Sequence, residues 1–367
     1  MEKRLYEYDY LKAFCALSVI LIHITALYID HSRPGYYLNQ LVRYAVPMFI
    51  VISGALLQVS QQNKKMTYGS FLTRRFNKIL IPYLIWTAVY MLYSLRNSLD
   101  TVSADVPGFL LDLGKRILLG TGYSHLYFVI IILQLYLLFP LLKKGLEKSP
   151  EIMLGSCLIL TLAFQTGVYL HLQQILVLPR FFIPYYIFFP TWVFYFVFGM
   201  YFTGAAGRWK GRIEKSPLLP GILWLASLVL LLADSRITHT YASSIKPSVM
   251  LYCILSFLFF YSLAVRLTRY TALNGAAQWI SLQSFTLYLS HLLILSLITY
   301  TAGKLGLSGI FKGSAGMLLL YAATCCSTLL FVYLAAQTPL APHLGGAYTF
   351  KPLRHGQGTT RGKTFGG

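Results

Sequence analysis

Residues 9–23 read Asp-Tyr-Leu-Lys-Ala-Phe-Cys-Ala-Leu-Ser-Val-Ile-Leu-Ile-His, an apolar run that holds a cation, Lys12, and an imidazole, His23. At about 1.5 Å and 100° per residue, the separation of Lys12 from His23 corresponds to about 16 Å and three helical turns, so both groups lie on one helix face. An ionisable side chain within a membrane span usually faces a bundle interior, a cavity or a substrate path, because exposure to lipid is costly. This helix is therefore expected to carry a functional site.

Composition identifies the chain as a multi-pass membrane protein. Its 367 residues are 56% hydrophobic and only 11% charged, whereas charged residues make up about a quarter of a soluble domain. The 31 Lys and Arg exceed the 11 Asp and Glu, but most of them fall in segments that alternate onto one side of the apolar runs. This distribution follows the positive-inside rule and argues against nucleic acid as a partner. The five cysteines lie in apolar runs, so neither a disulfide framework nor a metal-binding pair is indicated.

Ten apolar stretches have the length of a membrane-spanning helix, about 20 residues. They predict an all-α bundle in the lipid bilayer, with helices near residues 10–30, 42–60, 78–95, 124–142, 152–171, 183–203, 217–233, 248–265, 278–300 and 314–337. The first run lacks a signal-peptide cleavage pattern and is expected to remain as a span. We find no convincing internal repeat and no soluble domain.

An even number of spans places both termini on the basic side, which is the cytoplasmic side of a bacterial cell membrane. The longest loop, about residues 96–123, carries Asp100, Asp105 and Asp112 and is expected to face outward. We expect one membrane domain, residues 1–337, followed by a Gly-rich, polar, disordered cytoplasmic tail, residues 338–367.

Two elements at the basic side could bind an anionic group. Asp9 and Lys12 are three residues apart on the first span, so they can pair at the entrance and leave Lys12 for a phosphate or carbonyl contact; a snorkelling lysine is the alternative. Arg74, Arg75 and Lys78 lead into the third span, where clustered cations suit a nucleotide phosphate, lipid headgroups or membrane topology alone.

Histidines and hydroxyls supply polar groups deeper in the spans. His23 could act as a general base or could only hydrogen-bond a neighbouring helix. In the ninth span Ser284, Tyr288 and His291 are spaced i, i+4, i+7 and form one polar stripe, and His291 lies at a depth similar to that of His23. A shared cavity and structural hydrogen bonding between helices are both compatible with this pattern.

Two further motifs are ambiguous. In the second span Ser53-Gly54 lies in mid-membrane, where close packing against the first span is the favoured explanation. His125 and Tyr127 open the fourth span, either in an interfacial aromatic belt or along the path of an acceptor. We find no zinc-type cluster and no nucleotide-binding glycine loop, so neither a metal site nor a permanently bound cofactor is predicted.

Taken in order, these motifs resemble acyltransferase family 3, a family of integral membrane enzymes. The resemblance rests on Asp9-Tyr10-Leu11-Lys12 with His23, Val46-Pro47-Met48-Phe49 to Ser53-Gly54, Arg74-Arg75-Phe76-Asn77-Lys78 to Pro82-Tyr83, His125-Leu126-Tyr127-Phe128, and Phe285 to His291. It implies a ten-span bundle that transfers an acyl group, commonly acetyl, from cytoplasmic acyl-CoA to a hydroxyl of a sugar or other acceptor at the outer face.

The resemblance also implies roles for single residues. His23 stands at the family's catalytic histidine, and Lys12 stands where the family usually has arginine. Lysine keeps the charge but loses the bidentate geometry of a guanidinium. Arg75 and Lys78 fall on the family's basic element at the third span, and His125-Leu126-Tyr127-Phe128 is similar to a His-x-Trp-Phe motif with Tyr in the place of Trp.

The working hypothesis is an O-acyltransferase that uses acyl-CoA as co-substrate. Four cations would hold the phosphates of coenzyme A while the thioester reaches His23: Lys12, Arg74, Arg75 and Lys78. His23 would either deprotonate the acceptor hydroxyl or form a transient acyl-imidazole. His291, Tyr288 and Ser284 would orient His23 or the acceptor.

The acceptor would be a glycan or polysaccharide at the outer side. Several residues expected in outer loops are compatible with sugar binding but indicate no particular sugar: Tyr36, Tyr37, Tyr123, His125, Arg180, His239 and Tyr241. Two other hypotheses remain open. The chain could be a transporter that exports an unmodified glycan or lipid along the same polar residues, or a scaffold within a polysaccharide synthesis complex.

Overall fold

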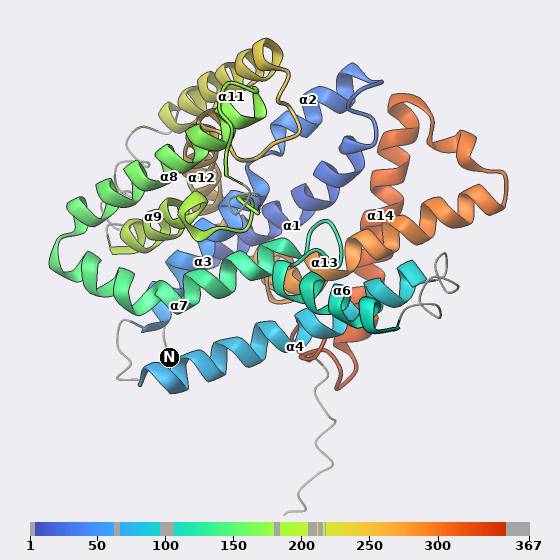
Figure 1. Ribbon diagram of the computed structural model, residues 1–367, viewed down its shortest axis with the longest axis horizontal. Helices are drawn as coiled ribbons and strands as arrows, with labels where there is room; N and C mark the ends of the chain where they lie inside the picture. The colour runs from blue at the N-terminus through green and yellow to red at the C-terminus, as the bar shows by residue number, and fades with distance from the viewer. Residues whose placement is uncertain are drawn as a thin grey trace, which may run out of the picture.

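The computed structural model describes residues 4–61, 67–95, 106–179, 184–204, 211, 216 and 218–349. Within these ranges the chain contains helices and turns but no strand. Nine apolar helical stretches are long enough to cross a membrane, with α2 and α3 forming one of them, which confirms the predicted helical membrane bundle (Figure 1). The helices are α1 Tyr6–Ala26, α2 Arg33–Leu41, α3 Ala45–Gln61, α4 Tyr68–Leu95, α6 Val106–Leu119, α7 Tyr127–Lys148, α8 Pro150–Leu172, α9 Val193–Gly204, α11 Leu219–Thr238, α12 Pro247–Leu267, α13 Thr271–Lys304 and α14 Gly313–Ala336.

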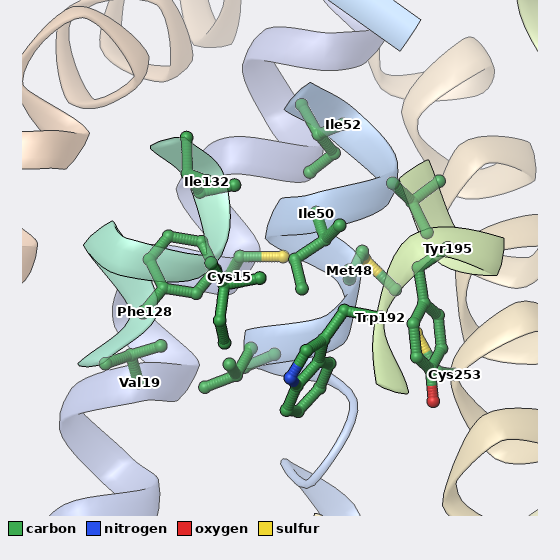
Figure 2. Packing of buried hydrophobic residues seen from close by; sticks show 14 of the residues in the cluster. Cys15, Val19, Met48, Ile50, Ile52, Phe128, Ile132, Trp192, Tyr195 and Cys253 are labelled. Atoms are coloured by element: carbon green, nitrogen blue, oxygen red, sulfur yellow. The ribbon is translucent and has the colours of Figure 1, made fainter. Parts of the chain in front are cut away.

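Helix α1, which carries Lys12 and His23, lies inside the bundle. It contacts α3 and α12 toward one side and α13 and α14 toward the other (Figure 1). Figure 2 shows part of the resulting core, where Cys15 of α1 lies beside Ile50 of α3 and Phe128 of α7. Lipid is as apolar as these side chains, so close packing rather than escape from water stabilises such contacts. The packing fixes the position of α1 within the bundle.

Helices α3 and α9 approach each other closely at two glycines. A Cβ atom at Gly54 would overlap the backbone of Phe196, and one at Gly199 would overlap the backbone of Val51. The sequence predicted close packing at Gly54, but against the first span. That prediction was wrong about the partner, because the small face at Gly54 turns toward α9, while Ser53 next to it faces a cavity.

Three elements differ from the predicted spans. The second span divides into α2, which is capped by Ser32 accepting a hydrogen bond from the Gly35 N–H at 3.3 Å, and α3. The sixth predicted span, residues 183–203, contains only the 12-residue helix α9, which is about 18 Å long; the 3-10 turn η2, Phe189–Thr191, precedes it. The predicted loop 96–123 contains α6 with Asp112, and Asp100 and Asp105 lie outside the described residues.

Residues 338–349, predicted as the start of a disordered tail, instead pack against the bundle. The Gln283 side chain of α13 donates to the Ala347 carbonyl at 2.7 Å and accepts from the Ala347 N–H at 3.1 Å. Trp86 of α4 donates to the Leu344 carbonyl at 3.2 Å. The prediction was wrong for this segment, because side chains of α13 and α4 form hydrogen bonds with its backbone and hold it in place despite its Gly-rich composition. The remainder of the predicted tail, residues 350–367, lies outside the described residues.

Candidate functional site

A cavity of about 380 Å³ opens among α1, α3, α4, α7 and α13 and is named the basic cavity. Its polar lining consists of residues that the sequence analysis selected, together with Tyr136 and Ser281: Lys12, Ser53, Arg75, Lys78, Ser284 and Tyr288. Its apolar lining includes Phe49, Ile79, Phe128 and Phe285. Segments far apart in the chain thus bring three cations to one apolar-walled space, a combination that suits a ligand with both anionic and apolar parts.

The cations of the basic cavity come from two helices. Lys12 lies on α1, and Arg75 and Lys78 lie near the start of α4, where Arg75 also donates to the Ser60 hydroxyl at 2.8 Å. Arg74 is exposed and does not line this cavity. The predicted pairing of Asp9 with Lys12 is absent from the ion pairs of the described residues, because Asp9 pairs with Arg4 at 2.7 Å.

A second cavity, of about 920 Å³, lies at the C-terminal end of α1 and is named the histidine cavity. Its polar lining includes two histidines, an arginine, an aspartate and several tyrosines: His23, His125, Arg43, Asp30, Tyr123, Tyr127, Tyr241 and Tyr288. His125 was predicted either in an interfacial belt or along an acceptor path. It is buried and faces this cavity instead of lying in an exposed aromatic belt.

Three imidazoles meet at the inner wall of the histidine cavity. The ring centroid of His23 lies 5.3 Å from that of His291 and 6.5 Å from that of His125. The rings of His125 and His291 are also 5.3 Å apart. His23 is half-buried, whereas His125 and His291 are fully buried behind it. The sequence placed His23 and His291 at similar depth, and the fold brings them together with His125.

Backbone carbonyls fix the protonation of two of these rings. His125 Nε2 lies 3.3 Å from the Leu289 carbonyl oxygen, and His291 Nδ1 lies 2.7 Å from the Tyr288 carbonyl oxygen. Because a carbonyl oxygen can only accept, each of these nitrogens carries the hydrogen. The opposite nitrogens, His125 Nδ1 and His291 Nε2, are buried without a hydrogen-bond partner and hold lone pairs. Two proton acceptors therefore stand beside His23.

The Leu289 carbonyl that holds the His125 ring also accepts a hydrogen bond from α4. The Tyr90 hydroxyl of α4 donates to the Leu289 carbonyl at 2.8 Å and accepts from the Leu293 N–H at 3.0 Å. It thereby bridges two backbone groups of α13 that are four residues apart. Tyr90 was not identified from the sequence, since a tyrosine within an apolar helix carries no distinctive pattern.

Tyr288 lines both cavities and therefore stands between them. Its ring contacts Phe128 and Phe49 on the basic side, with centroids 5.3 and 6.4 Å away, and His125 on the other side, 5.2 Å away. Its hydroxyl donates to the His125 carbonyl. Tyr288 is thus a wall residue common to the basic cavity and the histidine cavity.

The other residues predicted near an acceptor are placed as follows. Tyr36 and Tyr37 line a smaller pocket that shares Ile29 and Asp30 with the histidine cavity. Tyr241 donates to the Asp30 carboxylate at 2.6 Å. His239 is exposed and lines neither space, and Arg180 lies outside the described residues. The aromatic residues thus extend from the histidine cavity to the surface.

Two buried cations near the histidine cavity were missed by the sequence analysis. Arg43 lines the cavity, and Lys246 lies behind it in an ion pair with Asp234 at 2.8 Å. Burial lowers the pKa of Lys246, and the hydrogen bond and charge of Asp234 act in the opposite direction. A signal was available, because both cations fall at the predicted outer ends of spans, where the positive-inside rule does not explain them.

The described ranges contain no group of three or more His, Cys, Asp or Glu side chains arranged to hold a metal ion. The two cavities present imidazoles with free lone pairs, the buried guanidinium of Arg43 and the three cations of the basic cavity. Such a set can bind an anionic substrate and accept or deliver a proton.

Comparison with known proteins gives two relatives and one family. A "Probable poly-beta-1,6-N-acetyl-D-glucosamine export protein" of Staphylococcus aureus strain N315 is 27% identical over 319 residues, which cover 82% of this chain and 85% of that protein. A protein of the same description from Staphylococcus epidermidis is 29% identical over 318 residues, covering 82% and 84%. No solved structure matches the chain. The model of the Acyl_transf_3 family, described as an acyltransferase domain, matches residues 5–337. The chain therefore belongs to this acyltransferase family of multi-pass membrane proteins.

Proposed function

We propose that the chain is an O-acyltransferase that takes an acyl group, commonly acetyl, from cytoplasmic acyl-CoA and transfers it to a hydroxyl of a glycan at the outer face of the bacterial cell membrane. The observation that carries this proposal is the pair of cavities that meet at Tyr288, one cationic and the other lined by histidines. Membership of the acyltransferase family supports the reaction. The relatives named for export of a polysaccharide support a glycan acceptor.

In this proposal the donor binds in the basic cavity. Lys12, Arg75 and Lys78 contact the phosphates of coenzyme A, because clustered cations form strong charge-assisted hydrogen bonds with phosphate. The pantetheine arm lies along the apolar wall, and the thioester reaches past Tyr288 toward His23. Arg74 lies on the exposed surface and would contribute only to the field at the entrance.

The transfer itself exchanges a thioester for an ester. The acceptor oxygen attacks the acyl carbon, the bond from carbon to sulfur breaks, and the coenzyme A thiolate leaves toward the basic cavity. His23 takes the proton of the acceptor hydroxyl, and this proton finally neutralises the thiolate. Alternatively His23 first accepts the acyl group and then passes it to the acceptor. His291 and His125, whose free nitrogens stand beside His23, orient the ring or receive its proton.

An export function without acyl transfer is the second candidate, because the relatives carry that description. The same tyrosine-lined histidine cavity could then bind the glycan during passage. This alternative predicts that no acyl-CoA is consumed and that the exported glycan has no added acyl mass.

The deciding experiment uses purified protein with radiolabelled acetyl-CoA and oligosaccharides of N-acetylglucosamine. Wild-type protein is expected to label the sugar, and His23→Ala is expected to lose the contribution of a general base, about 10²–10⁴-fold in rate. His343→Ala provides the matched control, since this histidine is exposed and lines neither cavity. Transport of the oligosaccharide without labelling by wild-type protein would overturn the proposal in favour of export.

A further inference from the structure

Arg43 is a buried cation in the wall of the histidine cavity. It lies in the turn between α2 and α3, its side chain is 6% exposed, and it lines the same space as His23 and His125. The proposed acyl transfer assigns it no role. A guanidinium remains charged when buried. The neighbours of Arg43 therefore determine whether this charge is neutralised within the protein.

The partners of the Arg43 guanidinium are all neutral. Nη1 donates to the Ala242 carbonyl at 2.9 Å, Nη2 donates to the Asn39 side-chain oxygen, and Nε is buried without a partner. Among the described residues, no ion pair includes Arg43. The fold therefore holds this cation in place without neutralising it.

The same network ties Arg43 to the helix of His23. The Asn39 amide donates to the Ile22 carbonyl at 3.0 Å and to the Thr25 hydroxyl at 2.9 Å. Ile22 immediately precedes His23 on α1. The guanidinium and the imidazole are consequently held in a fixed relation across the cavity, as a preorganised site requires.

Lys246 is a second buried cation near this cavity, and it differs from Arg43 in having an acidic partner. Its ammonium lies 2.8 Å from the Asp234 carboxylate, and the Ser235 hydroxyl accepts a further bond at 2.8 Å. Asp234 also accepts from Tyr169 and Ser248, so both of its oxygens are engaged within the protein. The acid that lines the cavity, Asp30, is exposed and forms no ion pair with Arg43. One buried cation is thus neutralised within the protein, whereas the other has an unused donor.

We propose that Arg43 is an anion-recognition site of the histidine cavity and binds an anionic oxygen of the substrate beside His23. This inference rests on the proposed function, because the anionic oxygen is one that takes part in acyl transfer. The anionic oxygen has two possible sources, a carboxylate carried by the acyl group or the oxyanion that develops on the acyl carbonyl during transfer. Both suit a desolvated guanidinium with a free N–H.

Binding of a small anion tests the site without any turnover. Thermal unfolding of the purified protein in detergent is followed with succinate and with succinamide, its neutral analogue. Succinate alone is expected to raise the Tm of wild-type protein and of Arg116→Gln, a control at an exposed arginine paired with Asp112, and to leave the Tm of Arg43→Gln unchanged. Equal effects of succinate and succinamide on wild-type protein would overturn the proposal, and this comparison holds even where Arg43→Gln fails to fold.

Kinetics with two donors then separates the sources of the anion. If Arg43 stabilises the oxyanion, Arg43→Gln lowers kcat with acetyl-CoA by about 10²–10³-fold with little change in KM. If Arg43 binds an acyl carboxylate, the loss is confined to succinyl-CoA and is partly restored in Arg43→Lys. Unchanged turnover of both donors would contradict the inference. Wild-type protein that consumes neither donor would instead refute the proposed function, while the anion-dependent Tm still tests Arg43.

Discussion

At the scale of single residues, Arg74 and Arg75 are neighbours in the chain but face different surroundings. Arg75 lines the basic cavity, whereas Arg74 is exposed outside it. A hydrogen bond to a charged group contributes about 1.5–3 kcal/mol, so Arg75→Gln is expected to raise the KM for acyl-CoA by about 10- to 100-fold. Arg74→Gln is expected to change it by less than about twofold, as surface charges usually do. Steady-state kinetics with saturating acceptor measures both, and equal effects would contradict the assignment.

Tyr288 separates the two cavities by the bulk of its ring. Tyr288→Ala is therefore expected to join them, admit water to the thioester and raise hydrolysis of acyl-CoA in the absence of acceptor. Tyr288→Phe keeps the ring and loses only the hydrogen bond to the His125 carbonyl, so hydrolysis should remain at the wild-type rate. Release of free thiol is measured without acceptor, with folding checked by size-exclusion chromatography. An equal rise in both variants would show that the hydroxyl, rather than the ring, is the barrier.

The sequence identified the residues of the site where polarity stands out against an apolar run. His23, His125 and His291 were all selected for this reason, and the fold gathers them. Arg43 was missed because the cations considered for binding an anion were those at the basic side of the spans, and Arg43 lies at the predicted outer end of the second span. Helical spacing predicted an ion pair of Asp9 with Lys12, but Asp9 pairs with Arg4, which lies five residues earlier and just before α1. Spacing along one helix cannot exclude a competing partner from the adjoining chain.

At the scale of elements, α3 and α9 depend on two glycines for their close contact. A methyl group at Gly54 or Gly199 would overlap the facing backbone, which must then move apart. Gly54→Ala and Gly199→Ala are each expected to lower the free energy of unfolding by about 1–3 kcal/mol, as overpacked cores do. Gly155→Ala on α8, where no atom lies within 4 Å of the added Cβ, should be neutral or slightly stabilising because alanine favours helix. Unfolding in detergent by heat or denaturant compares the three variants.

The helices were largely predictable, because a run of about 20 apolar residues has few alternatives in a membrane. The sixth span shows where hydropathy fails. Residues 184–192 are aromatic and apolar but contain Pro184 and Pro190, and they form turns before α9 begins at Val193. The partner of Gly54 was not predictable either, since periodicity gives the face of a helix but not the helix that covers it.

At the scale of the whole molecule, the site depends on contacts between distant segments. α1 supplies Lys12 to the basic cavity and His23 to the histidine cavity, and α13 supplies Tyr288 between them. Lys12 and His23 thus lie in different cavities although they belong to one helix. The sequence indicated that His23 and His291 lie at similar depth, but it could not show that α1 and α13 are neighbours, because that contact follows from the fold.

The two cavities lie toward different ends of α1. The proposed reaction should therefore take its donor from one side of the membrane and its acceptor from the other. We expect that protein in sealed liposomes, oriented with its basic end outward, transfers radiolabelled acetyl groups from external acetyl-CoA to an oligosaccharide trapped inside. Acetyl-CoA is too polar to cross the bilayer, so the opposite orientation should give no product. Protease access to an N-terminal tag reports the orientation, and His23→Ala liposomes control for leakage. Product that forms only when donor and acceptor share one compartment would mean that the acyl group does not cross at Tyr288.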